Sequence, residues 1–270
     1  MQDKLSVAVT GSPLEETASQ KPSTENHPDF MPTYKTVSIL IPVFNEVNSL
    51  EALLAKLAGV DFCGLKKEWI IVDDGSNDGT RAILERLKAE GCPSYLSQKI
   101  IFHEHNKGKG AALRTAIQEA TGDIIVIQDA DLEYDPADYP ALIEKIIAGE
   151  ADVVYGSRFQ SRVSQKAFAG LHYWGNKLLT QITNLLFGAK ITDMETCYKA
   201  FKPELIKTVK IRSDRFDFEP EITAKVLKQG CKIVEVPISY HGRQFHEGKK
   251  ITWLDGLFAI KALIRFRFFD

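Results

Sequence analysis

The segment at residues 124–133 most limits what this chain can fold into. The apolar run Ile124–Ile127 leads directly into the sequence QDADLE, so a strand suited to burial ends in acidic side chains. Side chains of a strand alternate between its two faces, so Asp129, Asp131 and, if the chain stays extended, Glu133 project the same way. Such carboxylates repel one another and are costly to bury unless a cation lies between them.

The chemistry of these side chains indicates which cation would suit them. Oxygen ligands without His or Cys suit Mg²⁺ or Mn²⁺, and Mg²⁺ on one or two carboxylates normally completes its shell with substrate phosphates. The acidic segment therefore predicts a metal–diphosphate site. The alternative is a solvated acidic turn, because Asp-x-Asp pairs often arise by chance in a chain with 26% charged residues.

Apolar strands alternate with helical patterns across residues 36–155. The expected strands are 36–41 (halted by Pro42), 69–72, 100–102, 124–127 and 152–155, and the expected helices are 47–58, 78–89, 110–120 and 136–147. Continuous apolar strands that alternate with helices indicate an α/β fold with a mostly parallel sheet covered on both faces. Ligands of such sheets bind at the carboxyl ends of the strands, which is where the acidic residues fall.

The two ends of the chain differ from this central pattern. Residues 1–35 are rich in Ser, Thr, Pro and Glu without periodicity, so we expect a disordered tail. After Gly156 we expect helices at 172–187 and 218–228 and a strand at 233–237. The main domain is therefore expected to span 36–250, followed by an amphipathic helix within 251–270.

Composition excludes several classes of protein. A hydrophobic content of 44% and a net charge of −2 describe an ordinary globular protein and give no sign of a nucleic-acid partner. The cysteines lack CxxC spacing and no secretory signal is evident, so we expect reduced cytosolic thiols. No apolar run is long enough to span a bilayer. We therefore expect a cytoplasmic protein that is at most peripheral on a membrane.

Polar residues follow the first two expected strands. Phe44 and the backbone around it are placed to line a base pocket, whereas Asn45 has the alternative role of capping the next helix. Asp73 and Asp74 end the second strand, where a carboxylate accepts hydrogen bonds from a nucleobase edge or ribose hydroxyls, and Asp78 heads the following helix. GxGxxG and Walker motifs are absent, which argues against a dinucleotide-binding Rossmann domain.

Cations flank the same strand ends. The sequence HNKGKG at 105–110 is suited to phosphate at a helix N-terminus, and equally to a structural turn. Arg158 ends the fifth strand, where it would bind a phosphate bidentately or form a salt bridge to one of the aspartates of the acidic segment. Asp193 and Glu195 lie in a later loop. The basic loop 241–250 is suited to closing over an anionic substrate.

Five motifs in order, PVFNE, VDDGSNDGT, HNKGKGAAL, IQDADLEYDP and YGSR, resemble the family-2 glycosyltransferases with the GT-A fold. TDMETCYKAF, FDFEPEITAKV and EVPISYHGR…EGKK extend the resemblance to most of residues 37–268. Within the family the chain is most similar to the dolichol-phosphate mannose synthase and polyprenyl-phosphate hexosyltransferase branch. This implies a GT-A catalytic domain, a nucleotide-diphosphate sugar donor and a polyprenyl phosphate acceptor.

The resemblance also implies roles for individual residues. The metal is assigned to Asp129, Asp131 and Glu133, and the acceptor phosphate to Arg158. The implied catalytic residues are Asp131, Asp193 and Arg158, and the residues implied to bind the nucleotide or its diphosphate are Pro42, Phe44, Glu46, Asp74, Ala130, Arg243 and Lys249.

This sequence departs from the branch in three respects. Glu133 stands where the branch often has Gln, which adds charge and is expected to tighten metal binding. Asn176-Lys177 stands where the branch often has Arg-Lys, which weakens the case for a lipid phosphate unless Lys177 or His172 substitutes. The membrane helices common in relatives are also missing.

The mechanism that fits is a single in-line displacement at the anomeric carbon, with inversion. A phosphate acceptor is already anionic and needs no general base, whereas a hydroxyl acceptor needs one, and Asp193 sits where related enzymes place theirs. A non-catalytic nucleotide-sugar-binding protein is a further alternative. The helix at 251–269 combines apolar residues with Lys261, Arg265 and Arg267, so it is expected either to lie at a membrane surface or to pack on the domain.

Overall fold

A computed structural model describes residues 34–94, 96–161, 171–242 and 253–269. The expected tail at 1–35 lies almost wholly outside these residues, as does most of the basic loop, including Arg243 and Lys249. The whole described part belongs to one compact unit, Thr33–Asp270.

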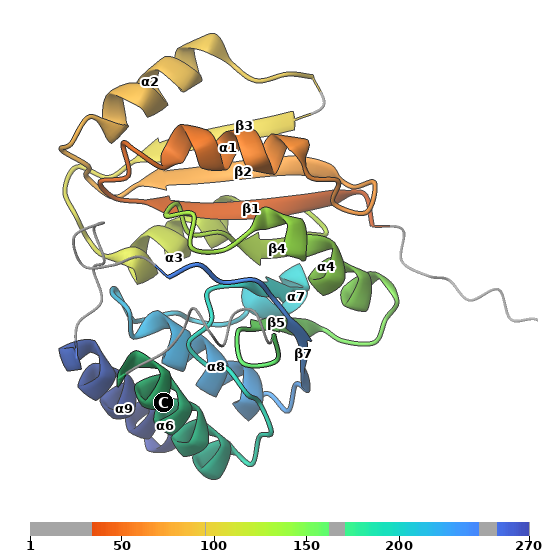
Figure 1. Cartoon of the computed structure of the whole chain (residues 1–270), viewed down its shortest axis with the longest axis vertical. Coiled ribbons are helices and arrows are strands. Elements are labelled where there is room, and N and C mark those ends of the chain that lie inside the picture. Colours follow the sequence, from red (N-terminus) through yellow and green to blue (C-terminus); the bar gives the residue numbers. More distant parts are fainter. Residues whose placement is uncertain (1–33, 95, 162–170, 243–252, 270) are drawn as a thin grey trace, which may run out of the picture. The chain divides into compact units, whose positions relative to one another are not determined.

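A seven-stranded sheet with the order β3-β2-β1-β4-β6-β5-β7 forms the centre of this unit (Figure 1). The strands are β1 Thr36–Val43, β2 Lys66–Asp73, β3 Leu96–Phe102, β4 Ile124–Ile127, β5 Val153–Ser157, β6 Lys199–Phe201 and β7 Ile233–Pro237. All neighbouring pairs are parallel except those of β6, which is antiparallel to both β4 and β5. The expectation of a mostly parallel sheet is confirmed.

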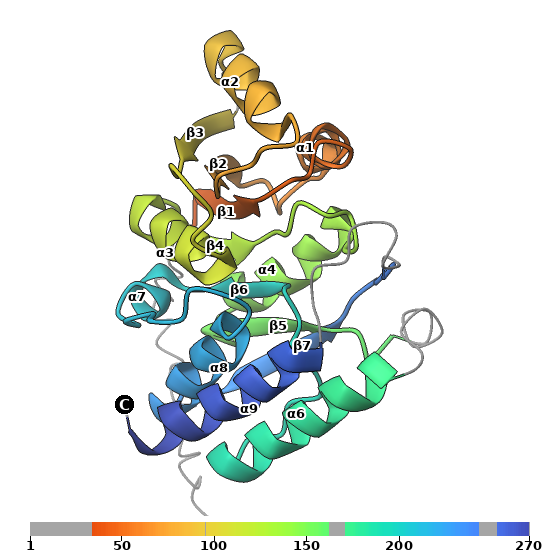
Figure 2. The ribbon, with the colours of Figure 1, turned by 90° about the vertical axis from the view of Figure 1, so that its left-hand side faces the viewer.

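Helices cover both faces of the sheet (Figures 1 and 2). On one face the buried core joins α1 Leu50–Gly59, α2 Thr80–Glu90 and α4 Tyr139–Ile147 to the strands. On the other face it joins α3 Lys109–Glu119, α7 Pro203–Ile206 and α8 Phe218–Lys228. Helices α6 Leu171–Phe187 and α9 Trp253–Phe268 lie side by side, and their buried residues include Leu179 and Leu263.

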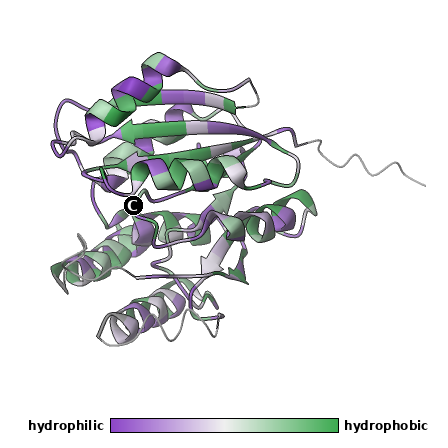
Figure 3. Cartoon of the chain, turned by 45° about the horizontal axis from the view of Figure 1, so that its top comes forward, coloured by the Kyte–Doolittle hydropathy of each residue, from purple (hydrophilic) through white to green (hydrophobic). Residues whose placement is uncertain are grey.

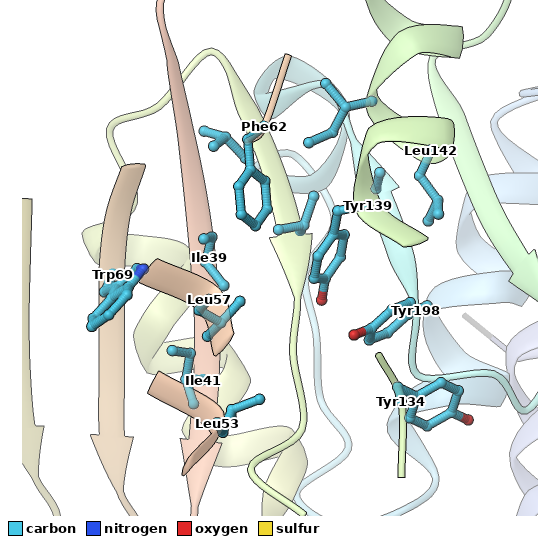
Figure 4. Close-up of a cluster of buried hydrophobic side chains, with 14 of the residues drawn as sticks. Ile39, Ile41, Leu53, Leu57, Phe62, Trp69, Tyr134, Tyr139, Leu142 and Tyr198 are labelled. Atoms are coloured by element: carbon cyan, nitrogen blue, oxygen red, sulfur yellow. The ribbon is translucent and has the colours of Figure 1, made fainter. Parts of the chain in front are cut away.

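The apolar stripe expected on the first helix is buried as the periodicity indicates. Leu50, Leu53, Leu54 and Leu57 of α1 are all buried and pack with the β1 side chains. Figure 4 shows Leu53 and Leu57 beside Ile39 and Ile41 of β1. Figure 3 shows hydrophobic and hydrophilic residues interspersed along the helices, as one-sided burial requires.

Strand β1 does not stop at Pro42 as expected but continues to Val43. Val43 O accepts a hydrogen bond from Asp74 N at 2.8 Å, so by alternation the backbone of Pro42 faces the β4 side. The last bond on that side joins Gln128 N to Leu40 O. Proline has no N–H to donate, and it is tolerated here because the ladder of hydrogen bonds to β4 has already ended.

Several other element boundaries differ from those expected. The first helix begins at Leu50 and not near residue 47, and the helix expected at 136–147 divides into the 3₁₀ turn Pro136–Asp138 and α4. Strand β6 was not expected, because three residues, KAF, carry too little pattern to distinguish a strand.

The carboxyl ends of β1, β2, β4 and β5 all meet at one edge of the sheet. Val43 pairs with Asp73 in register, and Leu40 pairs with Ile127, the last residue of β4. The first residues after these strands therefore lie along one edge, where ligands of parallel sheets bind.

Candidate active site

Two tyrosines fix the chain where β4 ends and the acidic segment begins. Tyr139 of α4 donates its hydroxyl hydrogen to Ile127 O at 2.6 Å, and Tyr198 donates to Gln128 Oε1 at 2.8 Å. Their rings stack with centroids 4.4 Å apart, and Tyr134 continues the row at 4.8 Å from Tyr198 (Figure 4). The end of β4 is thus attached to a rigid aromatic cluster.

Asp129 is neutralised by a lysine from the protein itself. Lys109 Nζ, at the start of α3, lies 2.9 Å from the Asp129 carboxylate and 2.8 Å from Glu219 of α8. Burial alone would raise the pKa of Asp129, but Lys109 lowers it. The expectation that this cluster is uncompensated without a metal is therefore wrong for Asp129. Sequence reasoning missed Glu219, although an acid on the buried face of an amphipathic helix was a signal.

The acidic segment does not stay extended. Leu132 has a φ of 60°, and Glu133 N donates to Asp131 Oδ1 at 3.1 Å, so the chain turns between the two acids. Glu133 Oε2 accepts a hydrogen bond from Tyr240 at 2.9 Å. β4 ends at Ile127, so the extended chain on which the shared direction of Glu133 depended is not present.

The residues still have the chemistry that a divalent cation requires. Asp131 and Glu133 are partly exposed and offer only oxygen ligands, which suits Mg²⁺ or Mn²⁺. Within the described ranges, no three His, Cys, Asp or Glu residues are gathered as a ready-made metal site. The assignment of the metal to Asp129, Asp131 and Glu133 remains a prediction.

Asp74 organises the turn before α3. It accepts hydrogen bonds from Lys107 N at 3.0 Å and Gly108 N at 2.7 Å, and its Oδ1 lies 2.7 Å from His103 Nδ1. The HNKGKG segment is thereby held as a structural turn, which favours that alternative. Asp74 is only 2% exposed, and its contact with a nucleoside stays a prediction.

Residues after β1 join the turn after β2. Asn45, with a φ of 53°, accepts from Asn77 N at 2.9 Å, and Asn45 N donates to Ser76 Oγ at 2.9 Å. Asn45 therefore does not cap α1, because its side chain is used between the two loops. Asp78 accepts from Thr80 N, but α2 begins at Thr80 with Gly79 at its N-cap position, so Asp78 lies one residue before the cap that was expected of it.

The other residues implied to bind the nucleotide lie along the same edge. Glu46 is buried and its Oε2 accepts from Ser49 Oγ at 2.6 Å. Pro42 and Phe44 are partly exposed, whereas Ala130 is buried. Their contacts with a nucleotide stay predictions, as do those of Arg243 and Lys249 outside the described residues.

Arg158 and Asp193 form a buried ion pair. Arg158 Nε and Nη2 each donate to the Asp193 carboxylate at 2.8 Å, and Arg158 N donates to Oδ2 at 3.0 Å. Asp193 N in turn donates to the Glu235 carboxylate. The salt-bridge alternative for Arg158 is therefore found, but its partner is Asp193 and not an aspartate of the acidic segment.

Comparison with known proteins identifies the class to which this fold belongs. A glucosyl-3-phosphoglycerate synthase from Mycobacterium tuberculosis, solved with Mn²⁺, UDP and phosphoglyceric acid, superposes with a TM-score of 0.63 at 20% identity, covering 87% of this chain and 80% of that one. A second structure of that enzyme, with UDP, gives 0.64 at 19% identity, covering 86% and 80%. The fold is GT-A, that of nucleotide-diphospho-sugar transferases.

Residues 38–210 match the profile of the family described as glycosyl transferase family 2. The chain belongs to this family.

Curated relatives extend over more sequence than this chain. The low-salt glycan biosynthesis hexosyltransferase Agl6 of Haloferax volcanii is 28% identical over 214 residues, which is 77% of this chain and 48% of that protein. The dodecaprenyl-phosphate galacturonate synthase of Rhizobium johnstonii is 29% identical over 211 residues, 77% of this chain and 60% of that protein. The chain thus spans only about half to three fifths of these two relatives.

Proposed function

We propose that the enzyme transfers a hexose from a nucleotide-diphosphate sugar to a polyprenyl phosphate, with inversion and with a divalent cation. The observation that carries the choice of acceptor is the buried pair between Arg158 and Asp193. A hydroxyl acceptor requires a base, and Asp193 is the candidate, but its side chain is fully buried and both carboxylate oxygens accept from Arg158. The group that a hydroxyl acceptor would need as its base is therefore already engaged by the guanidinium.

A phosphate acceptor removes the need for a base. Its oxygen is anionic at neutral pH and attacks the anomeric carbon directly, while the nucleoside diphosphate leaves from the opposite face. Arg158, which Asp193 holds in place, supplies the positive charge that orients the acceptor phosphate. A relative that makes a dodecaprenyl-phosphate sugar supports this acceptor class.

The leaving diphosphate gains charge in the transition state, and cations near it lower the barrier. A divalent cation held by Asp131 and Glu133, with Asp129 beside them, would supply this stabilisation. Solved GT-A neighbours contain Mn²⁺ and UDP, which supports the same class of site. Arg243 and Lys249 are the residues of this chain proposed to share the task.

A surface formed by α6 and α9 suits an acceptor that resides in a membrane. On this α6–α9 surface Leu257 and Phe258 are 56% and 57% exposed, and Trp174 is 70% exposed. Phe266, by contrast, is buried, so one side of α9 packs on the domain while another stays open. The packing alternative thus holds for this side of α9, and contact of the exposed side with a membrane is part of the proposal.

Cations accompany these apolar residues. Lys177 lies on α6, and Lys261, Arg265 and Arg267 lie on α9. Apolar side chains beside cations favour binding to anionic lipid surfaces. No helix in the described ranges is long and apolar enough to cross a bilayer. We therefore propose peripheral binding at the cytoplasmic membrane face.

The acceptor assignment is tested by Asp193→Asn. A general base contributes roughly 10²–10⁴-fold to a rate, so its removal would lower kcat by that factor. With a phosphate acceptor, we expect kcat per folded molecule to fall by less than about 100-fold, and the unfolding free energy to drop because Arg158 loses its counter-charge. Unchanged stability together with a thousandfold loss of kcat would favour the hydroxyl acceptor.

A further inference from the structure

Glu195 differs from the other buried acids of this site. Its Oε1 is buried and receives no hydrogen bond from any residue in the described ranges, although the residue as a whole is partly exposed. Asp129, Asp193 and Glu219, in contrast, are each paired with a lysine or an arginine. Buried polar groups in native proteins almost always have a partner. A ligand bound beside Arg158 would supply the missing partner.

The charged groups around Glu195 come from each element packed against it. They are Glu219 of α8, Lys199 of β6, Arg158 at the end of β5 and Asp193 of the same loop. The amine of Lys199 donates to Met194 O at 3.2 Å and to Thr196 O, and within the described ranges it is not hydrogen-bonded to Glu195 Oε1. Glu195 therefore has charged neighbours without being paired.

These surroundings determine the protonation of Glu195. Burial and the negative charge of Glu219 raise its pKa to about 8, while Lys199 and Arg158 act in the opposite direction. At neutral pH the side chain thus keeps its proton and offers an O–H donor. A neutral carboxyl group can approach a phosphate, whereas a carboxylate would repel it.

We propose that Glu195 is a substrate-binding residue that donates its carboxyl hydrogen to an oxygen of the acceptor phosphate beside Arg158. This rests on the proposed function, because it takes a phosphate monoester as the acceptor. Arg158 supplies the charge for that phosphate and Glu195 supplies a hydrogen bond, so the pair distinguishes a phosphate from an alcohol. No bond to Glu195 is made or broken in the reaction.

The experiment measures binding of farnesyl phosphate to the full chain by calorimetry between pH 6.5 and 9.5. Since only the protonated form binds well, the Kd of the wild type should rise roughly tenfold from pH 7 to pH 9. A phosphate monoester has its second pKa near 6, so the ligand is already mostly the dianion at pH 7 and its charge changes little between pH 7 and pH 9. Glu195→Gln keeps a neutral donor at every pH, so its Kd should stay nearly constant.

Matched controls separate the possible failures. Glu119→Gln, which alters an exposed ion pair with Lys99, should keep the wild-type pH profile. Infrared difference spectroscopy follows the carboxyl stretching band as the pH is raised. The carboxyl group that loses its proton at alkaline pH in the wild type should be absent from Glu195→Gln and present in Glu119→Gln. Identical pH profiles in wild type and Glu195→Gln would overturn the role of Glu195. Absence of farnesyl phosphate binding at every pH would overturn the proposed acceptor itself.

Discussion

Tyr240 donates its hydroxyl hydrogen to Glu133 Oε2 at 2.9 Å while its ring lies beneath the guanidinium of Arg158, 5.2 Å from the ring centroid. One buried side chain therefore contacts both a residue predicted to hold the metal and one predicted to hold the acceptor phosphate. Gly242 lies close by, where a Cβ would come within 2.9 Å of the Tyr240 ring. The geometry makes Tyr240 a positioning residue for both sides of the reaction.

Tyr240→Phe removes the hydrogen bond to Glu133 but keeps the ring under Arg158. Mutation of residues that orient metal ligands typically lowers metal affinity by about 10–100-fold. We therefore expect Mn²⁺ to bind Tyr240→Phe at least several-fold more weakly than the wild type. Titration of Mn²⁺ in the presence of UDP measures this directly, with Asp131→Asn as the reference for loss of binding. Tyr155→Phe, whose hydroxyl contacts Thr223, is the matched control. Equal Mn²⁺ affinity in Tyr240→Phe and wild type would refute the role.

Lys109→Met leaves Asp129 and Glu219, whose side chains are 15% and 5% exposed, without their counter-charge. Breaking a buried ion pair by removing one partner costs about 3–5 kcal/mol, so the variant should be markedly less stable at pH 7. Lys99→Met, which removes an exposed pair with Glu119, should cost about 0–1 kcal/mol. Urea unfolding of both variants provides the comparison, and similar losses in the two would contradict the assigned burial.

The pH dependence of the Lys109 variant follows from the lowered pKa of Asp129. A carboxyl group whose pKa is lowered in the folded state adds stability above its unfolded pKa, and this stability disappears as the pH falls through the folded pKa. The stability difference between wild type and Lys109→Met should therefore shrink on acidification. A difference that stays constant from pH 7 to acid would show that packing, not charge, explains it.

Phe258→Glu introduces a charge into the α6–α9 surface. Because Phe258 is 57% exposed, the fold should tolerate the change, while binding to vesicles of anionic phospholipid should weaken by tenfold or more. Gln118→Glu adds the same charge at an exposed position of α3 and should leave vesicle binding unchanged. Vesicle co-sedimentation measures both, and wild-type binding by Phe258→Glu would exclude this surface as the membrane contact.

The sequence predicted the sheet and its ligand-binding edge because both depend on local pattern. Ile124–Ile127 is apolar on both faces, as a strand covered on both sides requires, and the helix 218–228 was found with its observed bounds. Pro42 was misread because its tolerance depends on where β4 ends, which a single strand does not reveal. Short strand β6 has no pattern of its own.

The site was predicted as a set of residues but not as a set of contacts. The pairs Arg158–Asp193, Lys109–Glu219 and Tyr240–Glu133 join positions far apart in the chain, and no periodicity indicates which cation meets which acid. The metal reasoning treated the acidic segment in isolation and so could not include the lysine that neutralises Asp129. Such pairings follow from the fold and become visible only with it.

Transfer to a matched pair of lipids tests the central claim most directly. The full chain is incubated with Mn²⁺, a panel of labelled nucleotide sugars and either undecaprenyl phosphate or undecaprenol, and the lipid-linked sugar is separated by chromatography. The proposed function predicts sugar on undecaprenyl phosphate for at least one donor, none on undecaprenol, and loss of transfer in excess EDTA. Transfer to the alcohol at a comparable rate, or full activity in EDTA, would contradict it.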